Sequence, residues 1–117
     1  MENYNIPDSS IQASSRHALG TKASLGRLNL QDLPAISGVG GPAWAAGVLN
    51  TQQWFKVDFG NWKTVSAIAT QGRQNIAQWV TTYRVSYSHD GLLYAAYKEN
   101  STSNVKVFWA LFFPILF

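Results

Sequence analysis

The sequence contains no cysteine, and this absence excludes several kinds of chemistry at once. Without a thiol, the chain can form no disulfide, build no cysteine-based zinc site and use no thiolate nucleophile. It has only two histidines, which on their own make a poor metal site. Thiol-dependent and metal-dependent catalysis are therefore poor explanations of this chain.

Charge is also scarce. Charged residues make up 13% of the chain, against about a quarter in an average soluble domain, while apolar residues reach 46%. The surface must then be built largely from Ser, Thr, Asn, Gln and Gly, which suits an extracellular β-protein. The nine basic residues are scattered, and this argues against a nucleic-acid partner. The net charge of +3 leaves a mild attraction to anionic lipid or sulfated glycan open.

The usual catalytic motifs are missing as well. The six carboxylates form no evident pair on one strand face, and there is no Gly-x-Ser-x-Gly elbow. Gly38-Val39-Gly40-Gly41 lacks the lysine and helix of a phosphate-binding loop. The first residues are too polar for a signal peptide, and the longest apolar run, Val107–Phe117, is too short to span a membrane. We expect a protein that is not an enzyme.

The patterns that are present belong to β-strands. Trp54–Phe59 alternates between apolar and polar residues, and Trp79–Ser88 alternates with Tyr83, Val85 and Tyr87 inward. Further strands are predicted at Ile11–Ser14, Val65–Thr70, Leu93–Tyr97 and Val105–Phe108, and Asp90-Gly91 predicts a type I′ hairpin turn. Short strands at this spacing, without a sustained helical period, predict an all-β sandwich or barrel.

Six blocks of sequence resemble, in order and spacing, those of discoidin or F5/8 type C domains. The first block is the opening, made of the three segments Ile6-Pro7-Asp8-Ser9, Ile11-Gln12-Ala13-Ser14-Ser15 and Gly26-Arg27-Leu28-Asn29. The other five blocks are Ala43-Trp44, Gln53-Trp54-Phe55-Lys56-Val57-Asp58-Phe59-Gly60, Ile68-Ala69-Thr70-Gln71-Gly72-Arg73, Gln78-Trp79-Val80-Thr81-Thr82-Tyr83-Arg84-Val85-Ser86-Tyr87-Ser88 and Asp90-Gly91. The resemblance implies an antiparallel β-sandwich, a galactose-binding-domain-like jelly roll with ligand-binding loops at one end. It also implies a non-catalytic, extracellular or cell-surface module.

Two departures from the family pattern stand out. The pair of bridged cysteines that usually opens and closes such domains is missing. After Lys106-Val107-Phe108, the sequence matches nothing in the two further strands that the family has. We therefore expect an incomplete domain over residues 1–108, its final strands missing, and an aberrant apolar tail over residues 109–117. Such a fold would be recognisable but poorly closed, with a sheet edge open.

The candidate ligand-binding residues lie in two loops. Arg16, His17 and Lys22 occupy the position of the first binding loop in the family. Arg73, with Gln74 and Asn75 beside it, follows a predicted strand, and an arginine here can contact ligand in relatives. A guanidinium suits sugar hydroxyls and carboxylates, although Arg73 could instead hold its own loop together. Two tryptophans that could stack on a sugar, Trp44 and Trp54, are expected in the core.

These features leave three hypotheses for function. The first is a lectin-like module that binds a cell-surface glycan or an extracellular-matrix protein. The second is binding to anionic phospholipid, which needs apolar loop tips such as Leu19, Leu25, Ile36 and Val39. The third is a truncated product without a ligand of its own. We expect no cofactor, and the resemblance leaves a structural calcium ion open.

Overall fold

A computed structural model describes residues 5–30, 42–74, 76–100 and 104–109 of the chain. These residues form two compact units, one within residues 1–78 and one within residues 79–117. In the described part, all strand pairs are antiparallel and the only helices are short 3₁₀ turns. The expectation of an antiparallel, all-β domain of the sandwich class is confirmed.

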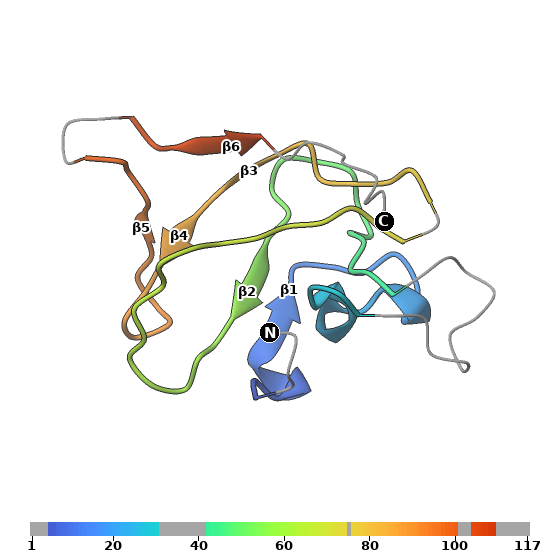
Figure 1. Ribbon diagram of the computed structural model, residues 1–117, viewed down its shortest axis with the longest axis horizontal. Coiled ribbons are helices and arrows are strands. Elements are labelled where there is room, and N and C mark those ends of the chain that lie inside the picture. The colour runs from blue at the N-terminus through green and yellow to red at the C-terminus, as the bar shows by residue number, and fades with distance from the viewer. Residues whose placement is uncertain (1–4, 31–41, 75, 101–103, 110–117) are drawn as a thin grey trace. The chain divides into compact units, whose positions relative to one another are not determined.

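The first unit is built around one pair of strands (Figure 1). β1 (Ile11–Ala13) runs antiparallel to β2 (Phe55–Val57), with Gln12 opposite Lys56. Two further backbone bonds extend the pair, from the Ser14 N–H to the Trp54 carbonyl at 3.0 Å and from the Asp58 N–H to the Ser10 carbonyl at 2.8 Å. The sequence predicted both elements, within Ile11–Ser14 and Trp54–Phe59.

Three 3₁₀ turns accompany this pair: η1 (Asp8–Ser10), η2 (Leu19–Thr21) and η3 (Ala23–Gly26). The apolar core of the unit is small, because Ile11 and Leu25 are the buried large apolar side chains among the described residues, 5% and 7% exposed. Trp44 packs beside them on Phe55, with ring centroids 5.5 Å apart. Trp44, which was expected in the core, is thus partly buried against it.

A buried arginine ties the start of the chain to this core. The side chain of Arg27 is 1% exposed, and its Nη2 donates to the Ile6 carbonyl and to Asp8 Oδ1, both at 2.7 Å. A charged group this deep is stable only when it is paired and hydrogen-bonded. Arg27 therefore fixes residues 6–8 against η3.

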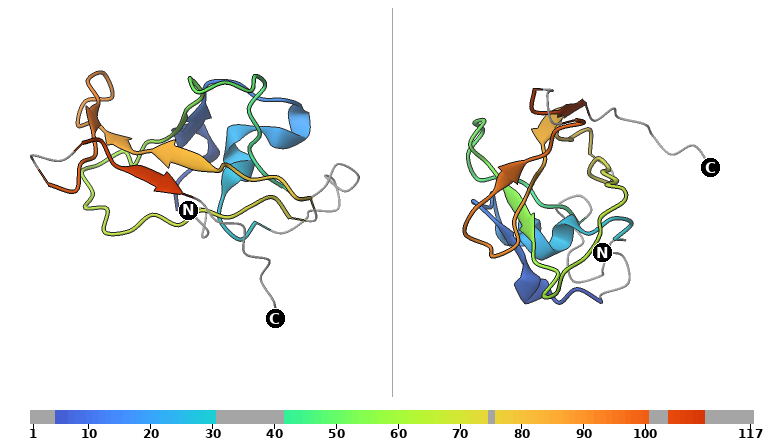
Figure 2. Two further views of the ribbon diagram at one scale, coloured as in Figure 1. Left: turned by 90° about the horizontal axis from the view of Figure 1, so that it is seen from above. Right: turned by 90° about the vertical axis from the view of Figure 1, so that its left-hand side faces the viewer.

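The second unit is a set of two short strand pairs. Figure 2 shows β3 (Thr82–Arg84) alongside β6 (Val107–Trp109), and β4 (Ser86–Tyr87) pairs with β5 (Ala95–Ala96). The rings of Tyr83 and Phe108 stack across the first pair, 5.3 Å apart. Tyr83 and Val85 are more buried than Arg84 and Ser86, as the alternation predicts, but Tyr87 is exposed.

Other expectations about the strands are wrong or only partly right. Residues 65–70 form no strand and are exposed, because no described segment pairs with them. The strand expected over Leu93–Tyr97 is limited to β5. Asp90 does not have the positive φ that a type I′ turn needs, although Gly91 does, at 73°. β6 ends at Trp109, and residues 110–117 lie outside the described part, so the boundary at residue 108 stays a prediction.

Many large apolar side chains of the described residues are exposed, among them Trp62, Leu92 and Leu93. The expectation of a poorly closed sandwich stays a prediction. No helix among the described residues is long and apolar enough to cross a membrane.

Candidate functional site

The first candidate loop, residues 15–22, is joined to a second loop, residues 44–50. Trp44 Nε1 donates to the Ser15 carbonyl at 2.8 Å, and the Gly47 N–H donates to Ser15 Oγ at 2.9 Å. The His17 N–H donates to the Ala45 carbonyl, also at 2.9 Å. We call these two segments the paired loops. Their bonds give a fixed backbone to a stretch that the sequence predicted only as a polar, basic loop.

Gly47 allows the two loops to approach each other closely. A side chain at this position would place its Cβ 2.7 Å from the Arg16 carbonyl oxygen, which is closer than real Cβ atoms come. Glycine is thus required here by contact with backbone and not by its φ angle. Sequence analysis missed this residue, because nothing local indicates that residues 16 and 47 meet.

Thr21 shapes the far end of the first loop. Its side chain is buried, and Oγ1 accepts a hydrogen bond from the Ala18 N–H at 2.9 Å while donating to the Ala18 carbonyl at 3.0 Å. These two hydrogen bonds close residues 18–21 into a turn, and Leu19 lies at the tip of the turn. Because hydrogen bonds within the turn fix its backbone, the position of Leu19 does not depend on contacts of its own side chain.

The paired loops carry apolar and basic side chains in solvent. Leu19 is 79% exposed and Leu49 is 97% exposed. Arg16, His17 and Lys22, the basic residues predicted for this site, are exposed on the same loops. Of the other apolar tips expected from the sequence, Leu25 is buried, which is a correction, and Ile36 and Val39 lie outside the described residues. Leu49 was missed, although two apolar residues in a polar loop could have indicated it.

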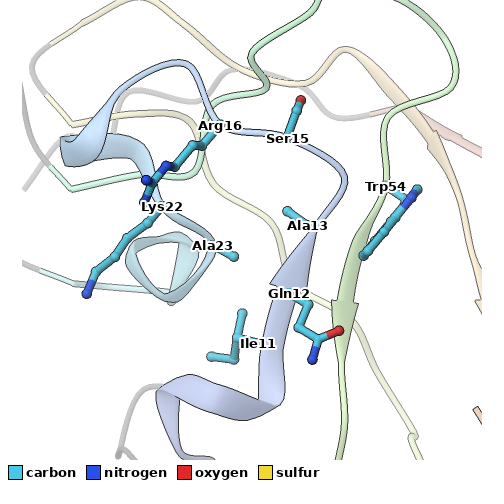
Figure 3. A pocket seen from close by; sticks show the side chains of 8 residues that line it. All are labelled: Ile11, Gln12, Ala13, Ser15, Arg16, Lys22, Ala23 and Trp54. Atoms are coloured by element: carbon cyan, nitrogen blue, oxygen red, sulfur yellow. The ribbon is translucent and has the colours of Figure 1, made fainter.

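A hollow of about 430 Å³ lies beside β1 (Figure 3). Eight residues line it: Ile11, Gln12, Ala13, Ser15, Arg16, Lys22, Ala23 and Trp54. It therefore brings together two of the predicted ligand residues, Arg16 and Lys22, but not His17. Trp54 is 49% exposed, so the expectation that it lies in the core is wrong. Its position just before β2 leaves its ring at the open side of the strand pair, with Lys56 Nζ 5.9 Å from the ring centroid.

The charge at this hollow is positive. Its lining includes Arg16 and Lys22 and no carboxylate. The nearest acid that is paired with a lining residue is Asp8, whose Oδ2 lies 3.9 Å from Lys22 Nζ. Asp8 is engaged more closely with Arg27, whose hydrogen bond is the main reason that the pKa of the Asp8 carboxyl lies below its usual value. The ion pairs among the described residues do not include Arg16.

The second predicted loop is closed on itself. The Arg73 N–H donates to the Gln78 carbonyl at 2.8 Å, and Arg73 Nη1 donates to Gln78 Oε1 at 3.0 Å. Arg73 thus holds residues 73–78, which is the structural alternative that the sequence left open for it. Gln74 is partly buried, Asn75 lies outside the described residues, and neither Arg73 nor Gln74 lines the hollow. Their role in binding stays a prediction.

In its described part, the second unit contains a hollow and a turn built around Asp90. A second hollow, of about 500 Å³, is lined by Tyr87, Ala96, Tyr97, Lys98 and Asn100. The Asp90 carboxylate is engaged in its own turn, where it accepts from the N–H groups of Leu92 and Leu93. Among the described residues there is no group of three or more His, Asp or Glu side chains that could hold a metal ion.

Comparison with known proteins agrees with the resemblance to F5/8 type C domains over most of the chain. The F5/8 type C domain family matches residues 10–112. The chain is similar to rat lactadherin, with 37% identity over 113 residues, which is 90% of this chain and 25% of that protein. Mouse lactadherin is 34% identical over 113 residues, covering 90% and 23%. Mouse retinoschisin is 37% identical over 87 residues, covering 74% and 36%. The chain thus spans between about a quarter and about a third of the length of these relatives.

Proposed function

The chain belongs to the F5/8 type C domain family, and from that premise we propose that it is a non-catalytic extracellular binding module whose paired loops dock on a membrane surface of anionic phospholipid. The family match applies equally to a glycan ligand, so the choice rests on the loops. The observation that carries it is the exposure of Leu19 and Leu49 on loops that also present Arg16, His17 and Lys22.

This combination of side chains suits a lipid surface better than a single sugar. A leucine that leaves water for the acyl region gains roughly 1.5–3 kcal/mol when fully buried. A basic residue near an anionic leaflet adds about 1 kcal/mol. Neither gain requires a deep pocket, and the hydrogen bonds between the loops hold the backbone in place before any ligand arrives. Binding therefore loses little conformational entropy.

The test measures binding of the full chain to vesicles with and without phosphatidylserine. We expect binding to the anionic vesicles, weakened by salt, and little binding to phosphatidylcholine alone. Leu19→Ser and Leu49→Ser should each weaken binding by about fivefold, which corresponds to about 1 kcal/mol. Leu92→Ser is the matched control, because Leu92 is an exposed leucine of the second unit.

The result that would exclude this function is equal binding by the Leu19→Ser, Leu49→Ser and Leu92→Ser variants. A second pair of variants separates charge from insertion. Lys22→Gln should weaken binding to anionic vesicles and reduce its dependence on salt, whereas Lys63→Gln, at an exposed lysine outside the paired loops, should not.

A glycan, the first hypothesis from the sequence, is the second candidate. Trp54 favours it, because its half-exposed ring lies at the hollow together with Gln12 and Arg16. An indole face can stack on the apolar face of a sugar, while the amide and the guanidinium donate to hydroxyls or carboxylates. A glycan array checks this candidate: it requires specific binding that Trp54→Ala abolishes and Trp62→Ala, at another exposed tryptophan, leaves intact.

A further inference from the structure

The outer edge of β1 is a second feature of the same region, and the hollow beside it shares Arg16 and Lys22 with the paired loops. We propose that this edge takes up an extended, acidic segment of another polypeptide as an added β-strand. The hollow beside β1 provides the room, and its basic lining selects for carboxylates.

The pairing with β2 fixes which backbone groups of β1 point outward. The Ser14 N–H and the Ser10 carbonyl are bonded to the β2 side, and Gln12 stands opposite Lys56 between them. In an antiparallel pair, residues alternate between those bonded to the partner and those whose N–H and C=O point away. The backbone groups of Ile11 and Ala13 therefore point away from β2.

One outward residue, Ala13, is open to a partner strand. The Ile11 N–H already donates to the Asp8 carbonyl, and Ile11 is only 5% exposed. The N–H and C=O of Ala13 are left facing outward, and among the described strands β1 pairs with β2 alone. An edge of this kind is a template for another chain, because an added strand satisfies the outward N–H and C=O groups.

Residues on both sides of β1 line the hollow (Figure 3). Ile11 and Ala13 extend from one side of β1 and Gln12 from the other, the side on which Trp54 lies. Ala23 faces β1 from η3, while the Lys22 side chain extends away from β1. The lining of the hollow thus reaches both faces of β1, and it also includes Trp54, just before β2. Its volume of about 430 Å³ accommodates a few residues of extended chain.

The lining decides which chain would fit. Ile11, Ala13 and Ala23 are apolar and suit the alternate small or apolar side chains of a strand. Arg16 and Lys22 add positive charge, and no carboxylate of the lining balances them. Peptide side chains with carboxylates are favoured by this charge and lysine side chains are disfavoured. A segment that alternates Val with Glu has both properties.

In the experiment, a blocked Val-Glu-Val-Glu-Val-Glu peptide is added to the isotopically labelled full chain. Backbone NMR and amide hydrogen exchange monitor the titration. We expect the Ala13 amide to exchange rapidly in the free chain and to become at least tenfold slower on saturation, while the Gln12 amide, which faces β2, changes little. The same peptide with N-methyl groups at alternate residues, and a Val-Lys peptide, should bind at least tenfold more weakly.

A protein variant tests the same contact from the other side. Ala13→Pro removes the outward N–H without touching the bonds to β2, and a proline is tolerated at an edge strand. It should abolish peptide binding, whereas Leu19→Ser, which is expected to impair vesicle binding, should leave peptide binding intact. If Ala13→Pro prevents folding, the N-methylated peptide still gives the answer with the unaltered chain.

Several results would overturn the proposal. An Ala13 amide that is already protected in the free chain means that the edge is occupied, by this chain or by a second copy. Equal binding of the N-methylated peptide means that no strand pairing takes place, and equal binding of the lysine peptide removes the charge selection. A neutral oligosaccharide that protects Ala13 where the peptide does not would assign the hollow to a glycan.

Discussion

Gly47 lies against the backbone of Arg16, at a separation that leaves no room for a side chain. A Cβ at position 47 would stand 2.7 Å from the Arg16 carbonyl oxygen and 3.1 Å from the carbonyl carbon. Backbone atoms cannot move aside as the end of a flexible side chain can. The geometry of the paired loops therefore depends on this glycine.

Gly47→Ala is accordingly expected to push the two loops apart. We expect it to destabilise the first unit by about 1–3 kcal/mol, the usual cost of overpacking, and to weaken vesicle binding because Leu49 is displaced relative to Arg16. Urea unfolding and vesicle binding measure the two effects. Gly20→Ala is the control in the same loop, since a Cβ there meets nothing within 4 Å. A Gly47→Ala variant as stable as Gly20→Ala would contradict the contact.

The ion pair between Arg27 and Asp8 predicts a dependence of stability on acid pH. The Arg27 hydrogen bond lowers the pKa of Asp8 from its ordinary 3.8 in the folded chain. A carboxyl with a lowered folded pKa contributes stability above its unfolded pKa, and this contribution is lost as the pH falls through the folded value. The free energy of unfolding should therefore decrease below about pH 4. Asp8→Asn should lose stability at pH 7 and show a weaker acid dependence; an unchanged acid dependence would exclude Asp8 as its source.

The turn of the second unit predicts a carboxyl that titrates far below its usual range. The N–H groups of Leu93 and Leu92, together with the Ser88 hydroxyl, lower the pKa of Asp90 from 3.8 to about 2. These bonds hold the turn above pH 4 and are lost as the pH falls through about 2. NMR titration of the Asp90 carboxyl carbon measures this value. Ser88→Ala should raise the pKa toward 3.8, and an ordinary pKa in the unaltered chain would show that the turn is not held this way.

The same turn shows where sequence reasoning reaches its limit. Asp90-Gly91 marks a turn, and there is one, with a positive φ at Gly91. The predicted turn type was wrong because the Asp90 side chain accepts hydrogen bonds from two backbone N–H groups. These local hydrogen bonds compete with the type I′ backbone conformation. β1 and β2 were predicted within residues 11–14 and 54–59, and these two segments do pair with each other. Residues 65–70 have an equally good local pattern but no described partner, and a strand needs a partner.

The candidate site was predictable in its residue types but not in its assembly. Arg16 and Lys22 were indicated by their place in a basic loop, and they do line one hollow. The contact between Gly47 and Arg16 joins residues 31 positions apart by number (47 − 16) and leaves no local signal. Trp54 was assigned to the core because it stands in a block that resembles the framework of the family, although its own side chain is half exposed.

The difference between the two tryptophans gives a last prediction, about stability. Trp44 packs on Phe55 and donates from Nε1 to the Ser15 carbonyl, so Trp44→Ala removes ring packing and leaves a loop carbonyl without its partner. Loss of a packed aromatic side chain costs about 3–5 kcal/mol in a full core, and in this half-buried position we expect about 2–4 kcal/mol. Trp54→Ala should cost less than about 1 kcal/mol, because its ring is 49% exposed.

Urea unfolding of both variants measures the difference, and Trp44→Phe divides it further. Phenylalanine keeps most of the ring contact with Phe55 but has no N–H, so this variant should lose about 1 kcal/mol, the net value of one hydrogen bond. Equal losses from Trp44→Ala and Trp54→Ala would contradict the packing described for the first unit. The ordering Trp44→Ala, then Trp44→Phe, then Trp54→Ala follows only if Trp44 joins the two loops to the core while Trp54 stays at the surface. In that arrangement Trp54 can be changed in a binding assay without unfolding the domain, and any loss of ligand can be attributed to the ring itself.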